Sequence, residues 1–95
     1  MMKQSRHSNI FDALEDDQGM AENLKIRAML MHALTDYIHE QELSQQAAAE
    51  FFDVNQPRIS NLVNGKIDKF TIDMLVNMLV KAGQHVDVVI KQDAA

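Results

Sequence analysis

The sequence predicts an all-α domain, a bundle of four to five helices extended by one C-terminal β-strand that pairs with a second copy of the chain. Three observations predict this fold. Apolar residues recur at helical spacing along most of the chain. Two of the predicted helices are separated by only about three residues. One segment near the C-terminus alternates apolar and polar residues with period two. The 95 residues fit one small domain with a thin core.

The composition limits the possible functions. Nine basic and 14 acidic residues give a net charge of −5, which argues against a wholly basic nucleic-acid coat and against an anionic membrane surface as target. The chain has no cysteine, so it forms no disulfide or thiolate metal site and fits a reducing compartment. The first ten residues lack the apolar stretch of a signal peptide, and no run approaches the roughly 18 apolar residues of a membrane span. We therefore expect a cytoplasmic protein.

Three regions are expected along the chain. Residues 1–20 form a flexible N-terminal segment, in which residues 10–14 are expected to form one short helical turn. Residues 21–83 form the helical domain, and residues 84–95 form the C-terminal strand and tail. The acidic residues are concentrated in the first half, since residues 1–53 carry a net charge of −6 and residues 54–95 a net charge of +1.

The first long helix is predicted from Ala21 to about Gln41. No proline interrupts this stretch, and its apolar residues recur every three or four positions. At 100° per residue they fall within one broad arc, which comprises Ile26, Leu30, Ala33, Leu34, Tyr37 and Ile38. This arc is expected to face the core.

Two short helices follow. Ser44 is a typical N-cap for a helix over residues 45–52, which contains three consecutive alanines, the best helix formers. After a break at residues 53–55, Pro57 lies in the first turn of a third helix, where its missing N–H has no intrahelical partner to lose. This helix is expected to end near Asn64, because the next residue is Gly65, which readily adopts a left-handed C-terminal cap.

A fourth helix is predicted after Thr71, its expected N-cap, and ends at Gly83. Its apolar residues at helical spacing are Ile72, Leu75, Val76, Leu79 and Val80. Residues 85–91 then place Val86, Val88 and Ile90 on one face, which is the pattern of a β-strand. A lone strand has no ladder partner in its own chain, so we expect these three residues to form a homodimer contact.

The spacing of the second and third helices is that of a helix-turn-helix, in which the second helix enters the major groove of DNA. Ala49 supplies the small residue needed where the two helices cross. The apolar positions that pack the helices together are Ala48, Phe52, Val54, Ile59 and Leu62. Asp53 occupies the turn position usually given to glycine, and aspartate tolerates a left-handed backbone better than most residues.

The third helix carries the predicted DNA-reading surface, because its polar side chains span about 140° opposite the apolar ones. Gln56 and Asn61 are expected to reach base edges, since an amide both donates and accepts hydrogen bonds at adenine. Arg58 lies at the flank and is expected to contact a phosphate, with a bidentate guanine contact as the alternative. The predicted DNA-binding residues are Gln45, Gln56, Pro57, Arg58, Ser60, Asn61, Asn64 and Lys66, with Lys69 as a further backbone clamp.

Residues 43–65 resemble the phage-repressor-like helix-turn-helix family, also called the XRE or Cro/repressor family. Further segments are similar to a branch of small regulators that includes HigA-like antitoxins, namely residues 9–14, 56–60, 65–66, 70–75 and 86–88. The resemblance implies a sequence-specific transcription regulator, most often a repressor that occludes a promoter. As a homodimer it would bind a pseudo-palindromic operator with half-sites about one helical turn apart. An antitoxin role would add a toxin protein as a partner.

Other functions fit the sequence less well. His32 and His39 are two helical turns apart, too far for the one-turn pair of a zinc helix, so we predict no metal and no cofactor. Ser44 lies near His39 and Asp36 in sequence, but there is no nucleophile elbow and no glycine-rich phosphate loop, so we predict no enzyme. The alternative is a protein-interaction module that inhibits a partner protein through its acidic half or its strand, without binding DNA.

Overall fold

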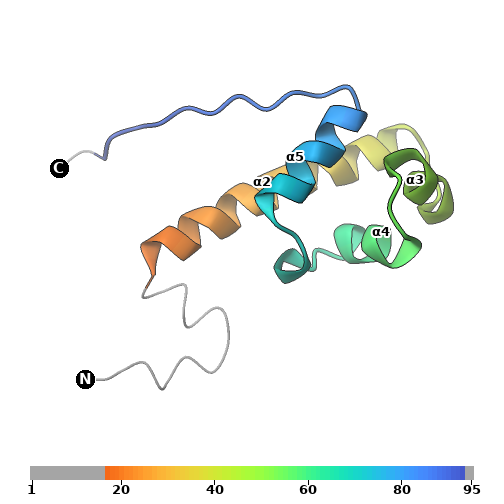
Figure 1. Ribbon diagram of the computed structural model, residues 1–95, viewed down its shortest axis with the longest axis horizontal. Helices are drawn as coiled ribbons and strands as arrows, with labels where there is room; N and C mark the ends of the chain where they lie inside the picture. Colours follow the sequence, from red (N-terminus) through yellow and green to blue (C-terminus); the bar gives the residue numbers. More distant parts are fainter. Residues whose placement is uncertain (1–16, 94–95) are drawn as a thin grey trace, which may run out of the picture.

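The computed structural model describes residues 17–93, and it confirms the all-helical class within them (Figure 1). Its elements are α2 (Gln18–Glu40), α3 (Gln45–Phe52), α4 (Gln56–Val63), the 3₁₀ helix η2 (Ile67–Lys69) and α5 (Ile72–Lys81). The helical turn expected at residues 10–14 lies outside the described residues. Among the helices of the described part, none is both long enough and apolar enough to span a bilayer.

The long helix α2 begins earlier than predicted, because Asp17 caps its N-terminus. The Asp17 carboxylate accepts a hydrogen bond of 3.0 Å from the backbone N–H of Met20. The residues that α2 buries are Leu24, Met31, Leu34 and Ile38. Of the predicted arc, Leu30, Ala33 and Tyr37 are partly buried against the core. The prediction is wrong for Ile26, which is 38% exposed, because it precedes Leu30, the first α2 residue that contacts the core cluster.

The helix-turn-helix forms as predicted. Ser44 caps α3, and its Oγ accepts a hydrogen bond of 3.0 Å from the backbone N–H of Ala47. Asp53 ends α3 with φ 58° and ψ 47°, the left-handed conformation expected at the turn. Pro57 lies in the first turn of α4. After α4, Gly65 also has a positive φ, 71°, which reverses the chain toward η2.

A single apolar cluster joins the four α-helices found in residues 17–93. Its buried members are Met31, Leu34, Ile38, Ala48, Ala49, Phe52, Ile59, Leu62, Phe70, Leu75, Met78 and Leu79. Five of the six predicted helix-turn-helix packing residues belong to this cluster, and the sixth, Val54, is partly buried against it. The core therefore fixes α3 and α4 against α2 and α5.

The last helix, α5, starts at the predicted cap. Thr71 Oγ1 accepts a hydrogen bond of 3.2 Å from the backbone N–H of Met74. The residues that α5 buries are Leu75, Met78 and Leu79. Val80 was predicted to share the core-facing side, and this is wrong, because it is 60% exposed. Val80 lies about 140° around the helix from Leu75, beyond the part that α2 covers.

The predicted β-strand over residues 85–91 is not formed in the single chain. Residues 84–93 run away from α5 as an extended segment without regular secondary structure (Figure 1). A β-strand needs hydrogen bonds to a neighbouring strand, and residues 17–93 include no other strand to supply them. Val86 is partly buried against the core, whereas Val88 is 76% and Ile90 is 88% exposed. The dimer contact assigned to these residues stays a prediction.

Candidate nucleic-acid interface

One side of α4 faces away from the core and carries most of the predicted DNA contacts. Gln56 and Pro57 are exposed in its first turn, Ser60 and Asn61 are half-buried along its length, and Asn64 is exposed at its C-terminus. The opposite side of the helix is buried against α3 and α2. The amide-bearing side of α4 is therefore outward, in the arrangement that a groove-reading helix requires.

The N-terminus of α4 is capped by Asn55, a residue that sequence reasoning did not single out. Its Oδ1 accepts a hydrogen bond of 2.8 Å from the backbone N–H of Arg58. An asparagine directly before Gln56 and Pro57 is a recognisable N-cap signal. The capped end of α4 is exposed, and its partial positive charge favours an anionic neighbour such as a phosphate.

Two of the predicted DNA contacts bond each other at the other end of α4. The Nδ2 of Asn64 donates hydrogen bonds to the backbone carbonyl of Ser60 at 2.9 Å and to its Oγ at 3.3 Å. The same carbonyl also accepts the backbone N–H of Asn64 at 3.0 Å, so the Asn64 side chain adds a second bond at the C-terminus of α4. Ser60 and Asn64 thus act as one unit in the free chain, whereas the side chains of Gln56, Pro57, Arg58 and Asn61 make no hydrogen bond to other residues of the range 17–93.

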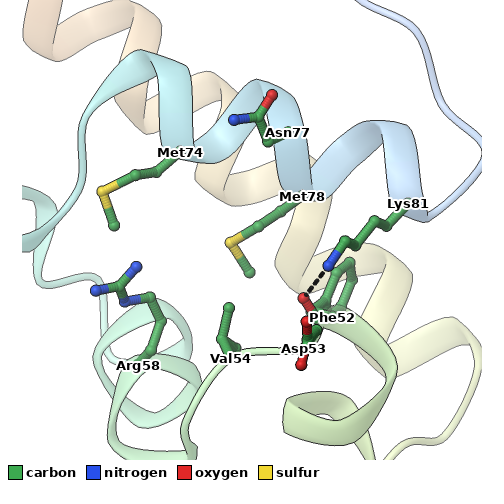
Figure 2. Close-up of a pocket in the computed structure, with 8 residues that line it drawn as sticks. All are labelled: Phe52, Asp53, Val54, Arg58, Met74, Asn77, Met78 and Lys81. Atoms are coloured by element: carbon green, nitrogen blue, oxygen red, sulfur yellow. Dashed lines mark hydrogen bonds between the residues drawn. The ribbon is translucent and has the colours of Figure 1, made fainter.

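Arg58 lies at the edge of the outward side, where α4 faces α5 (Figure 2). With residues of the turn and of α5, it lines a groove of about 190 Å³. Figure 2 shows its guanidinium group directed toward Met74 rather than along the outward side of α4. This placement agrees with the predicted flank position, from which a long side chain reaches a phosphate more readily than a base.

A lysine of α5 holds the turn of the helix-turn-helix. The Nζ of Lys81 donates a hydrogen bond of 2.8 Å to the backbone carbonyl of Phe52 (Figure 2). Phe52 is the last residue of α3, and carbonyls at a helix C-terminus carry partial negative charge. Lys81 therefore fixes the end of α3 beside the left-handed Asp53.

The remaining predicted contacts flank α4. Gln45 is exposed as the first residue of α3, Lys66 is exposed directly before η2, and Lys69 is exposed as the last residue of η2. Residues 54–70 contain three basic residues and one acidic residue, within a chain whose net charge is −5. The surface around α4 is therefore locally positive, although the whole protein is acidic. This distribution favours binding of one particular duplex over indiscriminate binding to DNA.

Two of the three histidines in residues 17–93 pair with carboxylates near the surface. His32 lies 3.3 Å from Asp36, and His85 lies 3.7 Å from Asp87. Within residues 17–93, no three side chains of the histidine, aspartate or glutamate type are close enough to share a metal ion.

Comparisons with known proteins match this architecture. Residues 13–91 match the model of a family described as a helix-turn-helix domain. A solved structure that bears the name of an XRE family transcriptional regulator superposes with a TM-score of 0.71 at 36% sequence identity. The match covers 77% of this chain and 82% of that chain. No curated protein matches the chain significantly.

Proposed function

This chain belongs to the XRE family of helix-turn-helix proteins, and we propose that it is a sequence-specific DNA-binding transcription regulator. The observation that carries the proposal is the outward polar side of α4, which is braced from behind by α3 and capped at its N-terminus by Asn55. In the bound state α4 lies in the major groove with its N-terminal turn toward the bases. The chain acts by binding alone and performs no chemistry on the DNA.

The predicted contacts divide into two kinds. Gln56 and Asn61 read base edges, because each amide can form a bidentate pair with adenine that is worth about 1–3 kcal/mol of discrimination. Arg58, together with Gln45 and Lys66, contacts the sugar-phosphate backbone and fixes the orientation of α4 in the groove. Specificity in this proposal comes from the amides, and salt dependence comes from the basic side chains.

We further propose that the regulator is a homodimer that represses by covering a promoter. Two copies are needed to read the two half-sites of a pseudo-palindrome. The exposed tail supports this proposal, because Val88 and Ile90 share one face of an extended segment whose backbone has no ladder partner within residues 17–93. Antiparallel pairing of two tails would give the backbone N–H and C=O groups of each tail a partner and restore the predicted strand.

A protein partner is the second candidate, and the same apolar tail favours it. Three consecutive exposed residues, Val88, Val89 and Ile90, could add to the edge of a strand in another protein. An antitoxin combines this contact with DNA binding, whereas a pure interaction module uses the tail alone. A regulator and an antitoxin both bind DNA, whereas a pure interaction module does not. A measurement of DNA binding therefore distinguishes the module from the other two functions.

The experiment starts from selection of a preferred sequence out of random duplexes of about 20 base pairs, long enough for two half-sites one turn apart. The selected duplex and a scrambled duplex of equal composition are then titrated by fluorescence anisotropy at several salt concentrations. The regulator is expected to prefer the selected duplex and to lose affinity as salt rises. Failure of selection, with equally weak binding to both duplexes, would favour the interaction module.

A further inference from the structure

Arg27 reaches from α2 to the segment that follows α4. Its Nη1 donates one hydrogen bond of 3.2 Å to the backbone carbonyl of Ile67 and another of 3.0 Å to the backbone carbonyl of Phe70. The two acceptors are the first residue of η2 and the residue directly after it. One guanidinium group therefore holds both ends of η2.

The same guanidinium group is fixed from its other side. The Nε of Arg27 donates a hydrogen bond of 2.7 Å to Oδ1 of Asn23, one turn earlier on α2. The guanidinium is planar and its donors have a fixed fork geometry, so a bond at Nε also sets the direction of Nη1. Asn23 thus aims Arg27 at η2.

The 3₁₀ helix has few other attachments. None of its residues is buried, and its N-cap residue, Lys66, makes no side-chain capping bond. Ile67 is partly buried against the core, and the backbone N–H of Lys66 bonds to the carbonyl of Asn61 at 2.9 Å. The Arg27 bonds therefore supply the polar link between η2 and the long helix α2.

Two exposed lysines depend on the position of η2. Lys66 directly precedes η2 and Lys69 is its last residue, so the carbonyls that Arg27 holds lie within one residue of each lysine. Figure 1 shows the short turn of η2 at the same lower edge of the molecule as α4. A duplex that contacts the outward side of α4 would pass close to this edge.

We propose that Arg27 is a positioning residue for DNA binding, which holds η2 so that Lys66 and Lys69 meet phosphate groups next to the groove that α4 occupies. The proposal rests on the DNA-binding function above. The proposal assigns Arg27 no contact with DNA, because three of its five N–H donors, at Nε and Nη1, are directed at protein acceptors. Lysine cannot replace arginine here, since a single ammonium has no fork that reaches three separate acceptors in fixed directions.

The test compares the salt dependence of DNA binding among four variants, with the selected duplex as probe. Arg27→Gln removes the charge and the fork, Arg27→Lys removes only the fork, Lys66→Ala/Lys69→Ala removes both phosphate contacts, and a triple variant combines the lysine changes with Arg27→Gln. Each lost phosphate contact lowers the slope of log affinity against log salt by about 0.9. We expect both single Arg27 variants to lower the slope as the double lysine variant does, and the triple variant to lower it no further.

Three results would overturn the proposal. A wild-type slope in Arg27→Lys would mean that charge alone matters. An unchanged slope in Arg27→Gln would mean that Arg27 is merely structural. A further drop in the triple variant would mean that Arg27 meets a phosphate itself. Lys25→Gln is the matched control, because it removes one charge from an exposed position of the same helix and should leave the slope unchanged.

A second measurement does not depend on DNA. The backbone N–H groups of Lys69 and Phe70 bond within η2, at 3.0 Å and 3.3 Å. In Arg27→Lys these two amides are expected to exchange hydrogen faster, while amides in the middle of α4 keep their wild-type rates. Unchanged exchange in η2 would contradict the proposal even if the protein binds DNA as proposed. Absence of salt-dependent binding in the wild-type protein would instead refute the proposed function. The hydrogen-exchange result would then still show whether Arg27 holds η2 in place.

Discussion

Lys81 at the end of α5 donates a 2.8 Å hydrogen bond from its Nζ to the backbone carbonyl of Phe52 at the end of α3, across 29 residues of sequence. The bond joins the last helix to the turn of the helix-turn-helix (Figure 2). The orientation of α4 therefore depends on α5 as well as on the motif that contains it. This dependence leads to the first prediction.

Lys81→Ala is expected to destabilise the domain by about 1–2 kcal/mol, because it leaves a partly buried helix-terminal carbonyl without its charged donor. Urea denaturation followed by circular dichroism measures the change. Lys91→Ala removes the same charge from the exposed tail and serves as control. Equal midpoints for the two variants would show that the bond contributes nothing to stability.

Gly65→Ala is expected to destabilise the domain by about 1–2 kcal/mol through backbone strain, because L-residues avoid a positive φ. Gly65 has a φ of 71°, and an added Cβ would meet nothing within 4 Å, so a steric clash contributes nothing. Gly19→Ala is the matched control: its Cβ would lie 3.4 Å from a carboxylate oxygen of Asp17, within a helix. That substitution should be neutral or stabilise by up to about 1 kcal/mol. A loss of stability confined to Gly19→Ala in thermal melts would contradict this account.

Local sequence signals correctly predicted the helix ends and the turn that position the candidate site. Ser44 and Thr71 cap the helices that follow them, and Asp53 takes the left-handed conformation at the turn. Each of these outcomes depends on a few neighbouring residues, so a short window of sequence contains the information. The helix-turn-helix packing residues followed for the same reason.

Features that depend on distant residues were predicted less well. Periodicity defines an apolar arc but not how much of it the other helices cover, which is why Ile26 and Val80 are exposed. Arg27 and Lys81 bond to backbone carbonyls 40 and 29 residues away, and no pattern in the sequence marks such an acceptor. The predicted tail strand needs a partner strand, and residues 17–93 contain none.

Val88→Asp is expected to convert the proposed dimer into a monomer, because pairing of two tails would bury an unpaired charge on each. Analytical ultracentrifugation at micromolar concentration measures the mass. Val89→Asp is the control, since Val89 points to the opposite face of an extended segment and its charge would stay in water. A wild-type protein that sediments as a monomer would contradict the dimer proposal, whatever the variants do.

Arg58→Ala is expected to weaken binding to every duplex about equally and to lower the salt slope by about 0.9, as loss of one phosphate contact requires. Anisotropy titrations with the selected and scrambled duplexes measure both effects. Lys25→Ala, an exposed charge on α2, should change neither. A loss of preference for the selected duplex would show instead that Arg58 contacts guanine.

The base preference of Gln56→Ala tests most directly whether the outward side of α4 reads DNA. The measured quantity is the ratio of affinities for the selected duplex and for variants with one base pair changed, at one fixed salt concentration. Loss of the amide is expected to remove about 1–3 kcal/mol of discrimination at one base pair per half-site and to leave the others unchanged. Gln84→Ala, exposed at the start of the tail, is the control. A Gln56→Ala protein with the wild-type preference at every position would contradict the account.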